Sequence, residues 1–468
     1  MKITCTRSLH FLSSLVLITV LGPACTKATQ TNSAEDALMR ESNYIADASF
    51  TEQATNHGEV QPSDEAYGAI NDVRLAQSGA DWVRPGEGAV ASIGLMAATK
   101  QLKATGHNID KYDRVLNAWF QTWLLSRQQP VNTKASDAAF GAISERVYYD
   151  AAGRKLRVDN YTAAATGQVI SAMWKYYEYK RAIGQTSAAN AWLQKAWSLA
   201  DNGGKFLNKC YDSTYKMVKS NPNAADLWIS DSTMSLVAMR CLAKWASVAK
   251  KTRSFDYNAL AGNLTVGLQK MKDPGAQWHN FYKVRLRSEN YKAGYGDSID
   301  QLCFLPYETN AIDPGEAYAR QISDWWTNGV DGIKMTPETS NSSDWKYYGT
   351  RWHWFWASSP DNSKLYPGPG LQLAKVEWKI FNRTGDKTAK ERAIKRYQWA
   401  SSKSGSNLWL GANGVIEANV PNGIVDWRDS THRDNTAGNW ERFVDTSAYF
   451  IEVTLMTAYN TDTKYVPD

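Results

Sequence analysis

Helix-like runs of apolar and small residues recur along the chain at an almost even spacing. Each run follows a turn rich in Asp, Gly or Pro, and successive runs begin about 70 residues apart. That spacing is too long for the common one-helix or two-helix solenoid repeats, but it accommodates a long helical hairpin with a long loop. We therefore expect a closed ring of six hairpins with one end free to carry chemistry. The runs open at Glu87, Asp159, Asp231, Asp300, Gly370 and Asp445.

Two sets of helices are predicted, and they differ in composition. The first set is rich in Ala, Gly, Ser and Thr, as in ASIGLMAATK, so it should be buried and closely packed. The second set is amphipathic, which is typical of a half-exposed outer layer. The inner helices are expected at residues 88–102, 161–182, 232–251, 298–309, 370–382 and 446–459. The outer helices are expected at residues 113–129, 188–207, 258–272, 315–329 and 388–402.

These patterns predict an all-α fold, a single (α/α)6 toroid over residues 61–468. Residues 63–78 could supply the sixth outer helix and close the ring from the N-terminal side. Strand signals are few, and short hairpins are expected in connecting loops around residues 205–217 and 404–419. An open α-solenoid is the alternative architecture.

The N-terminus has the pattern of a targeting segment. Lys2 and Arg7 precede an apolar stretch that is too short to span a bilayer, and small residues follow it. We expect a signal peptide over residues 1–24 and an exported protein: extracellular, periplasmic or anchored to the outer membrane. Cys25 resembles the lipid-modified cysteine of bacterial lipoproteins, although Gly22 stands where Leu is usual, and simple cleavage nearby is the alternative. Residues 25–60 are polar without a firm period, which predicts a linker.

Composition and charge indicate which binding partners and cofactors to expect. The formal net charge of +6 is mild and no basic block dominates, which argues against nucleic acid. No other apolar run is long enough for a bilayer, so membrane contact is expected only through a lipid anchor. Cys210, Cys241 and Cys303 are expected to be buried, with one disulfide possible in an oxidising compartment. No zinc, phosphate-loop or dinucleotide pattern occurs, and IVDWRDSTHRDN lacks the spacing of a calcium loop, so we expect neither metal nor cofactor.

Carboxylates gather in the turns that precede the inner helices. Any one of them is best explained as a helix N-cap, but a group around one cavity would push their pKa values apart, as acid/base catalysis requires. The group comprises Glu87, Asp159, Asp231, Asp300, Asp426 and Asp445.

Aromatic residues fill the same turns. The chain has 20 Trp and 24 Tyr, most of which must pack in the core, but those beside carboxylates suit stacking on sugar faces. These are Trp82, Tyr161, Trp228, Tyr291, Tyr295, Trp352, Trp354, Trp356, Trp427 and Trp440.

A ring of six hairpins with acidic and aromatic loops resembles the six-hairpin glycosidase superfamily. Two segments, VDNYTAAATGQ with Asp159 and WISDSTMSLVAM with Asp231, are similar to the acidic turns of unsaturated glucuronyl and rhamnogalacturonyl hydrolases. The resemblance covers residues 60–460 in architecture and only these segments in sequence. It implies an exported glycoside hydrolase acting on poly- or oligosaccharides, uronates included. Asp231 would be the acid/base and Asp159 its partner.

A second segment offers a different catalytic residue. RPGEGAVASIGLMAA resembles the Glu-Gly turn that opens the first inner helix of some inverting endoglucanases and chitosanases, which would make Glu87 a general acid. A sugar carboxylate could be bound by Arg351 with His353, or by Arg428 with His432.

Two other functions compete with hydrolysis. Related toroids act as polysaccharide lyases, which need a Tyr or His base and groups that neutralise the uronate. Tyr295 and the two Arg/His pairs could serve in that reaction. A non-catalytic glycan-binding lipoprotein is the third hypothesis.

Overall fold

The computed structural model describes most of the chain. The described residues are 22–51, 54–55, 58–71, 81–150, 153–270, 285–287, 305–313, 317–328, 364–365, 367–401, 428–429 and 444–468. Within these ranges, no helix has the length and apolarity needed to cross a bilayer.

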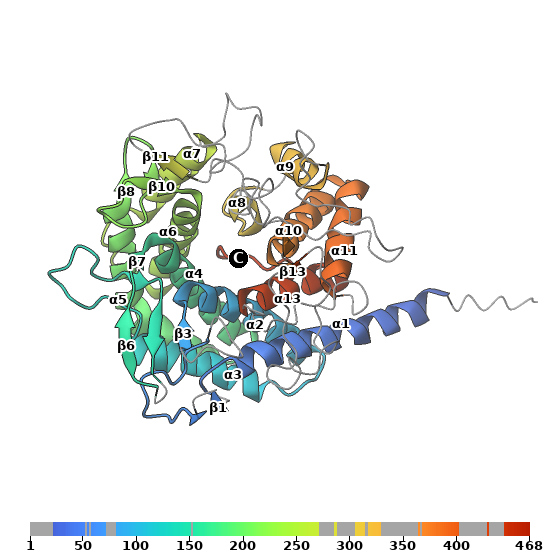
Figure 1. Ribbon diagram of the computed structural model, residues 1–468, viewed down its shortest axis with the longest axis horizontal. Helices are drawn as coiled ribbons and strands as arrows, with labels where there is room; N and C mark the ends of the chain where they lie inside the picture. The colour runs from blue at the N-terminus through green and yellow to red at the C-terminus, as the bar shows by residue number, and fades with distance from the viewer. Residues whose placement is uncertain are drawn as a thin grey trace, which may run out of the picture.

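Six helices form an inner ring, which Figure 1 shows face on. Each of them packs against the next, α2 on α4, α4 on α6, α6 on α8, α8 on α10 and α10 on α13, and α13 returns to α2. This closure confirms the predicted toroid and excludes the open solenoid. The inner helices are α2 (Pro85–Ala104), α4 (Ala163–Ala182), α6 (Ile229–Ala249), α8 (Leu305–Glu308), α10 (Pro367–Thr384) and α13 (Val444–Tyr459).

An outer layer surrounds the ring, and its helices begin and end within a few residues of the predicted positions. The first of them, α3, continues directly into a π-helical segment, η1. The outer elements are α3 (Asp110–Asn117), η1 (Ala118–Ser126), α5 (Thr186–Cys210), α7 (Tyr257–Lys270), α9 (Ala317–Asn328) and α11 (Lys387–Ser401).

The sixth outer position belongs to α1 (Gly22–Asp47), which packs against α13 and α2. The linker predicted over residues 25–60 is therefore wrong for most of its length. Leu38, Tyr44 and Ile45 are buried, although apolar residues are too sparse here to give a clear period. The helix predicted at residues 63–78 is also wrong as far as residue 71, because that segment forms turns. Residues 72–78 lie outside the described part of the chain.

Small residues let the inner helices approach closely, as their composition predicted. A Cβ atom on Gly94 of α2 would lie 2.7 Å from the Cβ of Ala448 in α13. A Cβ on Gly167 of α4 would lie 2.5 Å from the Met234 carbonyl in α6. Interiors this dense do not accommodate an added methyl group without movement. Close contact also brings the first turns of neighbouring helices together at one end of the ring, here called the rim.

Short antiparallel strand pairs form in the loops that connect the helices. One sheet, in the order β3-β5-β6, combines β3 (Asp81–Val83), β5 (Val147–Tyr149) and β6 (Lys155–Val158). Other pairs are β1 (Ala54–Thr55) with β2 (Gly58–Glu59), β4 (Ile143–Ser144) with β7 (Tyr161–Thr162), β10 (Asp226–Trp228) with β11 (Arg285–Arg287), and β12 (Lys364–Leu365) with β13 (Arg428–Asp429).

The predicted hairpin at residues 205–217 is only partly right. Helix α5 continues to Cys210, and the hairpin consists of β8 (Tyr211–Asp212) and β9 (Met217–Val218). The hairpin predicted at residues 404–419 lies outside the described residues. Cys210 and Cys241 are buried free thiols, as expected, and Cys303 is not described.

The C-terminal segment, residues 460–468, closes the end of the ring opposite the rim, and Figure 1 places the C-terminus at the centre of the ring. The carbonyl oxygen of Tyr465 accepts hydrogen bonds from Ser171 of α4 (2.6 Å) and from Cys241 of α6 (3.6 Å). Asn310, just after α8, donates to Asp462 at 3.0 Å. The tail therefore joins three inner helices across the floor of the barrel.

Candidate functional site

Three acids occupy the first turns of inner helices at the rim: Glu87 in α2, Asp231 in α6 and Asp445 in α13. The loop between β4 and β5 adds Glu145 and Arg146. Repulsion from Glu145 contributes to the raised pKa values of both Glu87 and Asp231, so this loop carboxylate lies near both helix starts. The structure therefore gathers acids that are far apart in sequence at one end of the barrel.

Glu87 is half-buried in the first turn of α2, where Pro85 begins the helix. Burial raises the pKa of Glu87, and repulsion from Glu145 adds to the effect. Arg84 opposes the shift through an ion pair at 3.6 Å. A helix N-terminus normally favours the ionised form of an acid, so burial and like charge outweigh the helix dipole here.

Asp445 is the acid whose pKa is most affected by Glu87. Burial, together with repulsion from Glu87, raises the pKa of Asp445 to about 7. The hydrogen bond from the Thr446 amide (2.8 Å) opposes the shift without cancelling it. Two mutually repelling carboxylates titrate as a pair, with one proton retained after the other is lost.

Asp231 is more deeply buried and fully bonded. It is 3% exposed; one carboxylate oxygen accepts from the Ala164 amide at 2.8 Å and the other from the Ser220 hydroxyl at 2.6 Å. Burial raises the pKa of Asp231 to about 6, although both hydrogen bonds favour its charged form. Because it joins the starts of α4 and α6, Asp231 is placed to hold the rim together.

Asp159 directly follows the end of β6. Its carboxylate accepts from the Tyr148 hydroxyl at 2.9 Å and lies 3.6 Å from the Arg157 guanidinium, which stacks over the Tyr148 ring at 4.1 Å. Among the described residues, no hydrogen bond or ion pair joins Asp159 to Asp231. The predicted partnership of Asp159 with Asp231 stays a prediction.

The other predicted binding residues divide into three groups according to how much of each the structure describes. Trp228 ends β10 immediately before α6 and packs partly buried against the core, at the rim as expected. Trp82, in β3, pairs with Tyr148 of β5, and Arg428 belongs to β13, but only the backbones of these two are described. Tyr291, Tyr295, Asp300, Arg351, Trp352, His353, Trp354, Trp356, Asp426, Trp427, His432 and Trp440 lie outside the described residues.

Three residues at the rim were not identified by the sequence analysis. Glu145 and Arg146 stand in a loop outside the repeat, and no pattern marked them. Tyr449 follows Asp445 by one helical turn and is buried, so helical spacing could have suggested that it faces the same way. Burial raises the pKa of Tyr449, and repulsion from Glu308, Asp445 and Glu87 adds to it, so this ring lies between the rim acids and acids inside the barrel.

No metal-binding geometry accompanies these acids: within the described residues, no three His, Cys, Asp or Glu side chains are arranged to hold an ion. The rim therefore presents, among its described side chains, carboxylates with raised pKa values and nearby guanidinium groups. This arrangement can transfer protons at mildly acidic to neutral pH.

Comparison with known proteins finds similar structures but no similar sequence. No protein-family model and no curated protein matches the sequence. Solved structures match over nearly the whole chain. A D-mannose isomerase has a TM-score of 0.56 at 10% identity, covering 94% of this chain and 100% of its own. The Hormoconis resinae glucoamylase has a TM-score of 0.56 at 9% identity, covering 94% of this chain and 75% of its own.

An unsaturated glucuronyl hydrolase variant matches with a TM-score of 0.52 at 10% identity, covering 92% of this chain and 96% of its own. The chain has the six-hairpin toroid fold. This confirms the architecture that the sequence resemblance implied. Identities this low establish the fold alone, and the matched proteins include both isomerising and hydrolysing enzymes.

Proposed function

We propose that this protein is a carbohydrate-active enzyme, a glycoside hydrolase that cleaves poly- or oligosaccharides by carboxylate acid/base catalysis at the rim. The Glu87–Asp445 pair is the observation that carries the proposal. Its two acids have raised pKa values and repel each other, so one can keep a proton while the other is ionised. Glycoside hydrolysis requires such a division between a proton donor and an ionised base or nucleophile.

Glu87 is our candidate for the acid, because its turn is the one that resembles the catalytic turn of endoglucanases and chitosanases. Asp445 is its ionised partner. Asp231 acts through the positions of α4 and α6, since both of its oxygens are already bonded. Asp159 and Trp228 stand at the rim where a sugar chain could be bound. The fold supports this assignment, because glycosidases occur among the matched structures.

The test is release of reducing ends from neutral and acidic polysaccharides by the purified protein. Glu87→Gln and Asp445→Asn should each lower the rate by about 100-fold to 10,000-fold, the usual contribution of a positioned acid or base. Asp110→Asn is the matched control, because Asp110 also stands in the first turn of a helix but is exposed and belongs to the outer layer. It should retain the wild-type rate.

Other outcomes would replace the proposal. Equal rates for wild type and Glu87→Gln would remove the pair from the mechanism. New alkene absorbance in the products would assign a lyase, and sugar interconversion without new reducing ends would assign an isomerase. No turnover with retained glycan binding would favour the binding protein.

Export remains part of the proposal, with a signal peptide over residues 1–24 and carbohydrate as the partner. Lipidation at Cys25 is tested by expressing wild type and Cys25→Ser in a bacterial host and separating membrane from soluble fractions. A lipid anchor would place wild type in the membrane fraction and the variant in the soluble one. The same distribution for both would leave export without an anchor.

A further inference from the structure

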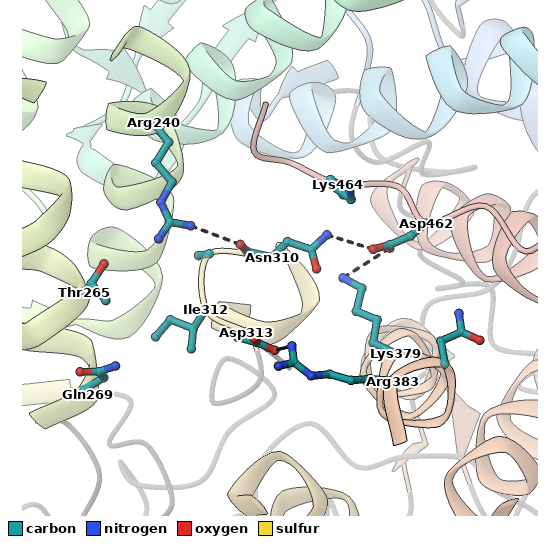
Figure 2. A pocket seen from close by; sticks show the side chains of 12 residues that line it. Arg240, Thr265, Gln269, Asn310, Ile312, Asp313, Lys379, Arg383, Asp462 and Lys464 are labelled. Carbon is teal, nitrogen blue, oxygen red and sulfur yellow. Dashed lines mark hydrogen bonds and ion pairs between the residues drawn. The ribbon is translucent and has the colours of Figure 1, made fainter. Parts of the chain in front are cut away.

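A cavity of about 690 Å³ lies between α6, α7 and α10, away from the rim acids. Figure 2 shows its lining. It lies beside the end of the fourth inner helix: α8 stops at Glu308, and Asn310 takes a positive φ of 60° that terminates the helix.

Cations dominate the described lining of this cavity. Four cationic side chains face two carboxylates, Asp313 and Asp462. Arg383 forms an ion pair with Asp313, and the Lys379 ammonium lies 3.5 Å from Asp462. Lys379 also donates to the carbonyl oxygens of Tyr307 (3.2 Å) and Glu308, which end α8. These two cations therefore have structural roles.

Arg240 has no comparable explanation. It stands in the middle of α6, so it does not neutralise a helix end, and it reaches toward the loop after α8 (Figure 2). Among the described residues, Arg240 makes one hydrogen bond, a long one of 3.4 Å to the Asn310 carbonyl. No carboxylate in the described part of the chain pairs with it. Burial lowers the pKa of the Arg240 guanidinium, and no described carboxylate offsets the cost of that burial.

An anion in the cavity would supply that compensation. A guanidinium offers five donors in a planar fork that matches carboxylate or phosphate oxygens. Lys464, exposed and 3.9 Å from Asp468, adds a second cation at the edge. Thr265, Gln269 and Asn382 contribute a hydroxyl and two amides, which suit the hydroxyl groups of a polyol. The volume lies within the range of small-ligand sites.

We propose that this cavity binds a small polyhydroxylated anion, a sugar carrying a carboxylate or a phosphate group, with Arg240 on the anionic group. The site is separate from the rim and does not depend on the reaction proposed there. The two sources of the anionic group, uronate and sugar phosphate, share this recognition and are distinguished by the binding experiment.

Calorimetric titration of the purified protein at low salt tests the site with glucuronate, glucose 6-phosphate, glucose and inorganic phosphate. At least one of the two sugar anions should bind, and should bind at least tenfold more tightly than glucose and inorganic phosphate. Arg240→Gln should weaken that binding at least tenfold, and Arg240→Lys should restore part of it. Arg253→Gln, an exposed arginine in the loop before α7, is the matched control and should bind as wild type does.

The rim variant Glu87→Gln separates this site from the catalytic one. Binding that survives Glu87→Gln and is lost in a folded Arg240→Gln protein supports the proposal, whether or not the rim proves catalytic. Binding lost in Glu87→Gln and kept in Arg240→Gln overturns it, because the anion then occupies the rim. Equal binding of inorganic phosphate and the sugar anions overturns the polyol part, and absence of any binding overturns the site.

Discussion

Carboxylates at the rim and carboxylates in the interior of the barrel differ in their bonding partners. At the rim, Glu87 and Asp445 repel each other and keep raised pKa values. In the interior, Glu308 and Glu452 flank Lys375, all three fully buried. Each interior oxygen has a partner: Lys375 serves both acids, Gln372 donates to Glu308 at 2.9 Å, and the Tyr465 hydroxyl donates to Glu452 at 3.2 Å.

This difference separates charges that maintain the fold from charges available for chemistry. Burial alone would lower the pKa of Lys375, but its two carboxylate neighbours raise it above the usual value, so the cation is firmly held. A buried acid with all oxygens bonded is poorly placed to give a proton to a ligand. Glu87 and Asp445 at the rim are half-buried and reachable, at a cost in stability that functional sites commonly bear.

Removing the interior cation should give the largest effect on stability. Lys375→Met leaves Glu308 and Glu452 buried without a counter-charge, so the free energy of unfolding should fall by about 3–5 kcal/mol. Glu87→Gln removes a repelled charge and should leave stability unchanged or raised. Denaturant unfolding at neutral pH measures both. A Lys375→Met protein as stable as wild type would show that the interior cluster is not maintained by its charge balance.

The second-largest effect is expected from a substitution that forces two inner helices apart near the rim. In Gly167→Ala, the added methyl would meet the Met234 backbone at 2.5 Å, which can relax only if α4 and α6 separate. We expect a loss of about 1–3 kcal/mol, as for other overpacked sites. Gly262→Ala in α7 is the matched control, since nothing lies within 4 Å of its Cβ position. The control should gain about 0.5–1 kcal/mol from helix propensity. Loss of stability in both variants would point to propensity rather than packing.

Much of the ring could be predicted because its physical causes are local. An inner helix needs small residues for close approach, and the chain repeats them about every 70 residues. Helix α1 was missed because it buries Glu41 and Ser42 beside Leu38, so its sequence looks like a solvated linker. Lys375 was also unremarked, since a lysine inside an apolar helix gains its meaning only from Glu308 and Glu452 on two other helices.

The site was predictable in its location but not in its pairing. An acid in a turn before an inner helix reaches the rim whenever the ring closes, which placed Glu87, Asp231 and Asp445 correctly. The pairing of Glu87 with Asp445 depends on contact between the first and last inner helices, and local sequence does not record that contact. Whether an acid is open or bonded depends on donors from distant loops, and Ser220 and the Ala164 amide supply both for Asp231.

The smallest expected effect is a change in the pH dependence of stability, which tests whether the rim acid Asp445 keeps its proton. The pKa of Asp445 is raised to about 7 in the folded protein, above about 3.9 for an unfolded Asp. The folded state therefore binds this proton more tightly, and the resulting stabilisation is complete below about pH 4 and lost as the pH rises to 7. Asn has no such proton to lose, so the stability of Asp445→Asn should rise relative to that of wild type as the pH increases from about 4 to 7.

Melting temperatures of wild type and Asp445→Asn from pH 4 to pH 8 measure this gain. Glu452, with its pKa raised to about 7 by burial against the opposing effect of Lys375, titrates in the same interval in both proteins and cancels in the difference. Asp231→Asn should show a similar divergence that ends near pH 6, and its lost hydrogen bonds should lower stability at every pH. The melting temperature of Asp110→Asn should change with pH in parallel with that of wild type. Parallel curves for Asp445→Asn would mean that Asp445 is ionised as an ordinary surface acid, and the proposed coupling between Glu87 and Asp445 would then be overturned.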